Sequence, residues 1–268
     1  MTNEQIIQQG RRFTKAIYDD PTFTSDQQQR KPQPPLTKTP VFEQRLRLPM
    51  DFDALELRND IIGVILGRES HRVYTGEAMT LRELSFLLWA TQGIKSIRGS
   101  NYATLRTVPC GGARHEFETY LAVRNVEGLA AGAYHYLPLT GELEYLGPLP
   151  DMESRITTSL CEQAWAAKAN VVFYWSIVPY RVEWRYGIYA HRVALIDAGH
   201  IGQNLYLACE AAGLGTCAVA AFDNALSNAL FALDGEEEYI IYTAPVGKVS
   251  PKDRAAELDF YAFLRNGD

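Results

Sequence analysis

The alternation of hydrophobic and polar positions along this chain predicts most of its regular structure. Apolar side chains recur at helical spacing from Leu84 to Leu88, after a Thr80 that is suited to cap a helix. Glu83 stands where a capping box places its acidic residue, so a helix is predicted over residues 81–91. Similar patterns predict helices over residues 4–18, 60–67, 152–166 and 189–212, the last ended by Gly213.

The strands have a different signature. Residues 170–177 form a continuous run of β-branched and aromatic side chains, which is typical of a central strand buried on both faces. A hairpin is expected around Thr140 and Gly141. The other strands are expected at residues 118–124, 132–137, 142–146, 216–222 and 238–246, with a short helix between the last two. Strands and helices do not alternate simply, which favours an α+β sandwich over a doubly wound sheet.

The N-terminal region differs from the rest in composition. Residues 19–48 contain five prolines and a glutamine run, so they are predicted to form an irregular arm that is either disordered or laid over another surface. We therefore divide the chain into an N-terminal helix with a proline-rich extended arm, residues 1–55, and a main domain, residues 56–268.

Composition excludes several classes of protein. The 268 residues are 47% hydrophobic, which is ample for a core, and the net charge of −6 argues against a nucleic-acid binder. The N-terminus lacks the pattern of a signal peptide, and no apolar run is long enough to span a membrane, so a cytoplasmic location is expected. The four cysteines show no C-x-x-C spacing, which indicates reduced thiols, and the five histidines show no ligand spacing, so no metal is predicted.

One short segment could bind a phosphate. Arg68, Ser70 and Arg72 follow the apolar helix predicted at residues 60–67. Two guanidinium groups and a hydroxyl that converge at a helix end can clamp a phosphate dianion. Taken alone, such residues are more often simply solvated.

Three other segments could carry chemistry. In the loop Pro109–Arg114, a proline followed by two glycines lets backbone N–H groups approach a ligand closely, although an ordinary turn has the same composition. Small residues between Gly213 and Phe222 leave room for a flat ring, or simply pack as a buried strand. Arg185 and Tyr186 precede the longest helix and could donate protons or stack on a ring, or lie on the surface.

Taken in order, these segments resemble the nitroreductase superfamily of flavin enzymes over residues 60–248, and most closely its SagB-type dehydrogenase branch. That branch includes the oxidases that convert thiazolines and oxazolines of modified peptides into azoles. The resemblance is carried by Arg68-Glu-Ser70-His-Arg72, Arg106-Thr-Val-Pro-Cys-Gly-Gly-Ala-Arg-His, Asp197-Ala-Gly-His-Ile-Gly-Gln-Asn-Leu, Gly213-Leu-Gly with Phe222-Asp, and Ala244-Pro-Val-Gly-Lys248.

The resemblance implies a three-layer α/β/α sandwich with a mostly antiparallel central sheet, and FMN bound at the interface of a homodimer. Arg68, Ser70 and Arg72 would hold the phosphate, with Lys248 beside them. The loop residues Pro109, Cys110, Gly111, Gly112 and Arg114 would reach the flavin of the partner subunit. Ala220 and Ala221 would lie at the N5 edge of the ring, and Gln163 at its polar side.

The chain departs from the family pattern at two positions. Arg185 stands where azoline oxidases have a lysine, and an arginine stays protonated, so it is a poor base for removing a proton from an azoline. It could instead stabilise negative charge, with Tyr186 as the proton donor. Cys110 replaces a common serine, a small change that should preserve the loop.

Two classes of function follow from these observations. The favoured one is a flavin oxidoreductase, which either reduces nitro or quinone compounds with NAD(P)H or oxidises a peptide-derived ring. The alternative is a non-catalytic module that keeps the fold and binds a peptide or partner through its arm.

Overall fold

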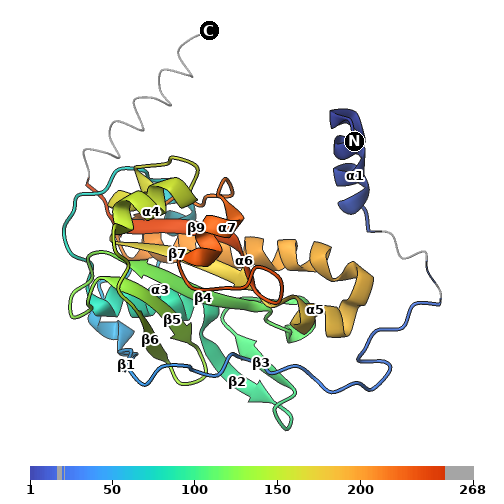
Figure 1. The fold of residues 1–268 in the computed structure, drawn as a ribbon. Helices are drawn as coiled ribbons and strands as arrows, with labels where there is room; N and C mark the ends of the chain where they lie inside the picture. The colour runs from blue at the N-terminus through green and yellow to red at the C-terminus, as the bar shows by residue number, and fades with distance from the viewer. Residues whose placement is uncertain (17–19, 21, 251–268) are drawn as a thin grey trace.

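The computed structural model describes residues 1–16, 20 and 22–250, and its centre is a seven-stranded sheet (Figure 1). The strand order is β1-β6-β5-β4-β7-β9-β8, and neighbouring strands pair antiparallel throughout. The strands are β1 Arg45–Arg47, β4 Phe117–Val123, β5 Gly132–Leu137, β6 Glu142–Gly147, β7 Val171–Ile177, β8 Leu214–Thr216 and β9 Tyr239–Lys248. A separate hairpin joins β2 Ile94–Arg98 to β3 Ala103–Arg106.

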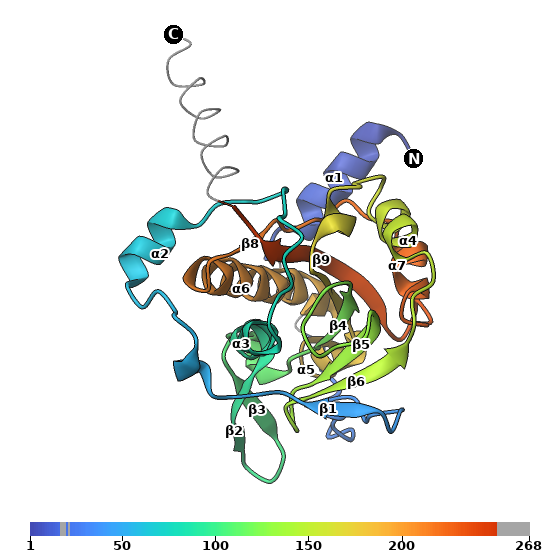
Figure 2. The same cartoon turned by 90° about the vertical axis from the view of Figure 1, so that its left-hand side faces the viewer.

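Helices cover both faces of this sheet, which makes the three layers seen in Figure 2. The α-helices are α1 Asn3–Phe13, α2 Ile61–Gly67, α3 Leu81–Gln92, α4 Met152–Ser159, α5 Pro179–Tyr186, α6 Ala190–Ala211 and α7 Asn224–Ala229. Side chains of β7 alternate between the layers: Phe173 and Trp175 belong to the core shared with α3 and α6, whereas Val172 and Tyr174 belong to the core shared with α4 and α7. The predicted α+β sandwich and its central strand are therefore confirmed.

Several helix ends follow directly from local chemistry. The capping box at α3 is present: Thr80 Oγ1 accepts a hydrogen bond from the N–H of Glu83, and the Glu83 carboxylate accepts one from the N–H of Thr80. Gly213, with φ of 67°, follows the end of α6.

Other expectations need correction. The helix predicted over residues 4–18 ends at Phe13, and Tyr18 lies outside the described residues. The helix predicted over 152–166 breaks after α4, because Cys161 and Glu162 adopt left-handed backbone conformations. The strand predicted at 216–222 begins too late: β8 ends at Thr216, and beyond it only a single bridge at Val219 is present. The hairpin β2–β3 and helix α5 were not predicted.

The arm is laid over the main domain, one of the two alternatives expected from its prolines. Its last residues form β1, which pairs with β6, so regular pairing resumes once the chain is past Pro40. Further back, the N–H of Gln27 donates to the carbonyl of Trp184, and Trp184 Nε1 donates to the carbonyl of Lys31. The arm therefore contacts α5 as well as the sheet.

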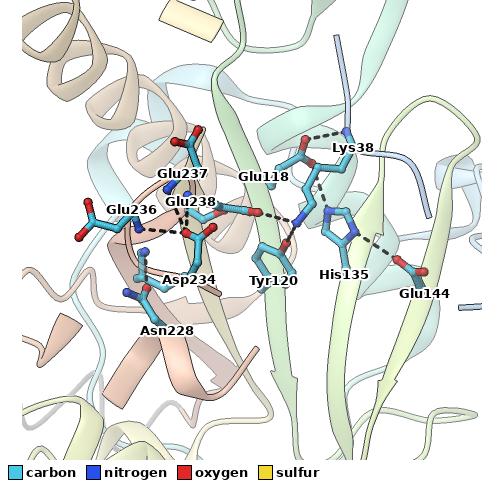
Figure 3. A network of polar contacts seen from close by, with 12 residues as sticks. Lys38, Glu118, Tyr120, His135, Glu144, Asn228, Asp234, Glu236, Glu237 and Glu238 are labelled. Carbon is cyan, nitrogen blue, oxygen red and sulfur yellow. Dashed lines mark hydrogen bonds and ion pairs between the residues drawn. The ribbon is translucent and has the colours of Figure 1, made fainter. Parts of the chain in front are cut away.

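A buried polar network attaches the middle of the arm to the sheet (Figure 3). Lys38 Nζ donates to Tyr120 Oη at 2.8 Å and contacts the Glu238 carboxylate at 2.5 Å, while its backbone N–H donates to Glu118 at 3.0 Å. Glu118 also pairs with the buried Arg181 at 2.6 Å and with His135 at 3.1 Å. This attachment fixes the arm where it passes toward the candidate site.

Two negative findings concern the described residues only. None of the described helices is long and apolar enough to cross a membrane. All four cysteines are free thiols, as predicted from their spacing.

Candidate functional site

The predicted phosphate cluster lies between α2 and β8. Arg68 follows the last turn of α2, and its guanidinium lies over the Tyr206 ring, 5.5 Å from the centroid. Arg72 lies over the Trp165 ring at 5.8 Å. Neither guanidinium forms an ion pair with any residue that the structure describes. Two guanidinium groups that form no ion pair with the described residues, one on either side of Ser70, are well suited to an anion.

Tyr206, which sequence reasoning missed, organises this cluster from α6. Its hydroxyl lies 3.1 Å from Ser70 Oγ and accepts a hydrogen bond from the N–H of Ala218 at 2.9 Å. The tyrosine thus connects the serine to the segment that follows β8. A single aromatic residue on a long amphipathic helix gives no signal of such a role in the sequence.

The other predicted flavin ligands on this side differ in their surroundings. Lys248 Nζ contacts the Glu83 carboxylate at 2.5 Å, so its charge is already neutralised within the chain. Gln163 Nε2 donates to the carbonyl of Ala221 at 3.1 Å, which places Gln163 beside the exposed segment Ala220–Ala221. The structure therefore brings Gln163, Ala220 and Ala221 together, whereas the part of Lys248 in phosphate binding stays a prediction.

The loop Pro109–Arg114 lies near the other end of α6. The N–H of Gly111 donates to Asp197 Oδ2 at 2.8 Å. Gly112 has φ of 58°, which favours glycine, and a Cβ added there would lie 2.3 Å from Arg185 Nε, so a larger residue would displace the Arg185 side chain. Arg114 is buried, donates to the carbonyls of Gly112 and Tyr102, and stacks on the Tyr102 ring at 4.9 Å.

The two predicted catalytic residues lie beside this loop, at the end of α5. Arg185 Nη1 donates to Gln27 Oε1 at 3.0 Å and to Tyr102 Oη at 3.2 Å, so the arm and the β2–β3 hairpin both reach it. Burial alone would raise the pKa of the Tyr102 phenol. The hydrogen bond from Gln27 and the nearby Arg185 guanidinium outweigh burial, so this pKa is lowered. Gln27 and Tyr102 had no distinguishing motif in the sequence.

Behind the loop lies a buried cluster of a thiol and two carboxyl groups. Cys110 Sγ donates to Glu116 Oε2 at 3.3 Å, and the cysteine and one oxygen each of Glu116 and Asp197 lie within 4.8 Å of one another. Burial, together with the Asp197 carboxylate, raises the pKa of Glu116 to about 7. Burial also raises the pKa of the Cys110 thiol, so the sulfur remains protonated and serves as a hydrogen-bond donor.

These two halves of the predicted site lie apart within one chain. Asp197, which holds the loop, and Tyr206, which holds the phosphate cluster, are nine residues apart on α6. That spacing corresponds to about 13 Å along the helix axis and to opposite sides of the helix. An open cavity of about 420 Å³ between α2, α3 and α6 is lined by none of the predicted flavin ligands. A single chain therefore does not bring the loop to the phosphate cluster.

Comparison with known proteins assigns a family to this fold. The profile described as "Nitroreductase family" matches residues 65–248. The chain belongs to the nitroreductase family. A curated relative from Methanocaldococcus jannaschii that carries the name of a nitroreductase is 32% identical over 206 residues, which cover 76% of this chain and 96% of that protein. The chain is thus an oxidoreductase of the nitroreductase family, whose members are typically FMN-dependent.

Solved structures support the fold assignment. A nitroreductase-type structure from Ralstonia eutropha matches with a TM-score of 0.62 at 22% identity, covering 82% of this chain and 96% of the other. One from Anabaena variabilis matches with a TM-score of 0.60 at 27% identity, covering 71% of this chain but only 38% of that longer one. The Escherichia coli microcin synthetase McbBCD complex matches with a TM-score of 0.55 at 19% identity, covering 93% of this chain and 83% of the matched one.

Proposed function

We propose that this nitroreductase-family protein is an FMN-dependent oxidoreductase of the SagB type, and that it works as a homodimer. The observation that carries the proposal is the pair of guanidinium groups of Arg68 and Arg72, on either side of the Ser70 hydroxyl, without a carboxylate partner among the described residues. Uncompensated positive charge on a folded surface favours an anionic ligand, and the phosphate of FMN fits these donors.

The separation of the two half-sites supports a second copy of the chain. With FMN anchored at Arg68, Ser70 and Arg72, the loop Pro109–Arg114 of the same chain lies beyond α6. A twofold partner would supply its own loop, as self-complementary contacts in a symmetric dimer do. In this arrangement Gln163, Ala220 and Ala221 contribute from the phosphate side, and Cys110, Gly111 and Gly112 from the partner.

An exposed apolar surface is available for that partner. On α2, Ile62 is 68% exposed and Leu66 is 80% exposed, and Ile61 and Ile65 are also more than half exposed. Leu195 and Ile196 of α6 are exposed as well. Large apolar side chains grouped on a surface mark an interaction site, and α2 leads directly into the phosphate cluster.

The chemistry of the substrate side follows from Arg185, Tyr186 and Tyr102. FMN, when bound, supplies hydride or single-electron transfer. Burial alone would lower the pKa of Arg185, but the neighbouring Tyr186 and Tyr102 hydroxyls outweigh burial and raise it. Arg185 therefore stays protonated: it orients and stabilises negative charge and does not act as a base. Tyr186 is the proposed proton donor, and Gln27 of the arm holds Arg185 in place.

The first experiment is spectroscopic. Purified protein should be yellow, contain one FMN per chain, and have the mass of a dimer. A colourless protein that also fails to take up added FMN would contradict the proposal and favour a non-catalytic module. NAD(P)H oxidation with a nitro or quinone acceptor, compared with turnover of an azoline-containing peptide, then decides the direction of the reaction.

The second candidate, an azoline-to-azole oxidase, has one observation in its favour: the match to the McbBCD complex extends over 93% of this chain and so takes in most of the arm. Arg185 in place of a lysine counts against proton abstraction at that position. Formation of azole absorbance from an azoline peptide, lost in Tyr186→Phe, would favour this candidate over the reductase.

A further inference from the structure

The buried cluster behind the loop Pro109–Arg114 contains a carboxylate oxygen that accepts no hydrogen bond from the described residues. Glu116 has no solvent exposure, and its Oε2 accepts the hydrogen bond from Cys110 Sγ. Its Oε1 is buried and has no hydrogen-bond partner among the described residues. Asp197, which is 4% exposed, accepts from the N–H of Gly111 through Oδ2. One oxygen of Glu116 lies within 4.8 Å of one oxygen of Asp197, so two buried acceptor groups stand together, and a proton between them resolves this arrangement.

We propose that Glu116 and Asp197 share one proton, and that this protonated pair is the positioning element that holds the backbone of Cys110 and Gly111 in its cofactor-facing conformation. The proposal rests on the proposed function, because it takes this loop to contact FMN. Glu116 acts through the loop and is therefore a positioning residue. The loop is attached to the pair at two points, the thiol of Cys110 on Glu116 and the amide of Gly111 on Asp197.

The surrounding groups leave the proton as the simplest link. The backbone N–H of His115 donates to Cys110 Sγ at 3.0 Å, so the sulfur is both donor and acceptor as a neutral thiol. His200 on α6 faces Asp197, with Nδ1 3.7 Å from Oδ1, too far for a good hydrogen bond. Arg106 of β3 and Arg114 of the loop act electrostatically on Cys110, and neither bonds to Glu116. The ring of Tyr186 of α5 lies near Gly111, where an added Cβ would be 3.4 Å from it.

The consequence is a pH dependence of the loop. Burial and the Asp197 carboxylate raise the pKa of Glu116 to about 7, and burial raises the pKa of Asp197 as well. When the shared proton leaves, two buried negative charges face each other and repel, and the hydrogen bonds that hold the loop are strained. FMN retention should therefore fall as pH rises above about 7.

The test compares wild type with Glu116→Gln. The amide of glutamine keeps the hydrogen bond from Cys110 on its oxygen and donates permanently to Asp197, so it reproduces the protonated pair. Above a pKa of about 7, the protonated fraction of the pair falls about tenfold for each pH unit. We therefore expect the Kd of wild type for FMN to be about tenfold higher at pH 8.5 than at pH 6.5. The Kd of Glu116→Gln should stay constant over this range, and Glu127→Gln, at an exposed position, should behave like wild type.

A measurement without flavin separates this proposal from the proposed function. The pKa of Glu116 is raised in the folded state, from 4.5 to about 7, so the stability it contributes is present below pH 4.5 and lost as pH rises through 7. The unfolding midpoint of the FMN-free protein should show this loss in wild type and Glu127→Gln, and lack it in Glu116→Gln. An infrared band of a protonated carboxylic acid should be present in wild type at pH 6 and absent from Glu116→Gln.

Three outcomes would overturn the proposal. The first is an unfolding midpoint with the same pH dependence in wild type and Glu116→Gln, and the second is a wild-type protein without the carboxylic acid band. The third is one equivalent of tightly bound transition metal that Cys110→Ser removes, since a cation would then bridge the oxygens. If Glu116→Gln does not fold, Asp197→Asn provides the amide donor from the other side. Absence of FMN binding in every variant contradicts the proposed function, while the flavin-free measurements still decide the pair.

Discussion

A substitution at Lys38 tests how the N-terminal arm is attached to the sheet. Lys38→Met keeps the length of the side chain but removes the ammonium, which contacts Glu238 at 2.5 Å and donates to Tyr120 at 2.8 Å. The Glu238 side chain is 10% exposed, and after the substitution its carboxylate loses the ammonium and keeps neutral donors such as Ser176 Oγ. The backbone N–H of Lys38 still reaches Glu118, so the arm loses one of its two anchors at this residue.

The size of the effect follows from burial. Removing one partner of a fully buried ion pair costs about 3–5 kcal/mol, but Lys38 is 32% exposed at its side chain, which lowers the expected cost to about 2 kcal/mol. For a chain of this size, about 2 kcal/mol corresponds to a melting temperature lower by roughly 4–8 °C. The arm should also become a preferred site of limited proteolysis.

The assay is a thermal melt with a proteolysis time course, and Lys31→Met is the matched control. Lys31 pairs with Asp26 in the same arm, but its side chain is 51% exposed, so its removal should leave the melting temperature unchanged. A melting temperature of Lys38→Met within about 1 °C of wild type, or an equal effect of Lys31→Met, would show that the buried contact does not anchor the arm.

Three further predictions concern the site and its support. Arg72→Ala should lower the FMN content of the purified protein more than Arg185→Ala does, because only the former is proposed to touch the phosphate; equal contents would remove the assignment. Gly112→Val should lower both FMN retention and turnover by displacing Arg185. Gly128→Val, at a glycine that also has positive φ but open space around it, should lower stability alone. Equal flavin contents of the two variants would contradict this prediction. Burial alone would raise the pKa of Glu118, but the Arg181 guanidinium outweighs it and holds this pKa below its usual 4.5. The stability that Glu118 contributes is therefore present above pH 4.5 and lost as pH falls. In urea unfolding, Glu118→Gln should be less stable than wild type by about 3–5 kcal/mol at pH 7, and this difference should narrow below pH 4.5.

The fold was predictable where local chemistry and tertiary packing agree. The capping box of α3, the glycine that follows α6 and the apolar run of β7 each specify their element without help from distant residues. The helix predicted over 152–166 failed because its middle turns through left-handed residues at Cys161 and Glu162, neither of which favours that conformation by its own chemistry. Helix α5 was missed because it is only eight residues long and follows a buried strand directly.

The candidate site was predictable only in part, for a related reason. Two parts of the site can be recognised in the sequence: the arginines on either side of Ser70, and the proline and two glycines of the loop Pro109–Arg114. Charge and backbone requirements restrict which residue types can occupy these positions. Tyr206, Gln27 and Tyr102 lie in contact with those segments through tertiary structure alone. The pairing of Glu116 with Asp197 was likewise hidden, since 81 positions separate them and no pattern in the sequence indicates that they meet.

Mixing subunits tests directly whether each flavin site is built from two chains. Arg72→Ala breaks the phosphate half and Gly112→Val the loop half, so each variant alone should lose FMN. In a heterodimer of the two, purified with two different affinity tags, one site carries both defects and the other carries neither. We predict one FMN per heterodimer and recovered turnover at that site. A verified heterodimer that remains without FMN would contradict it.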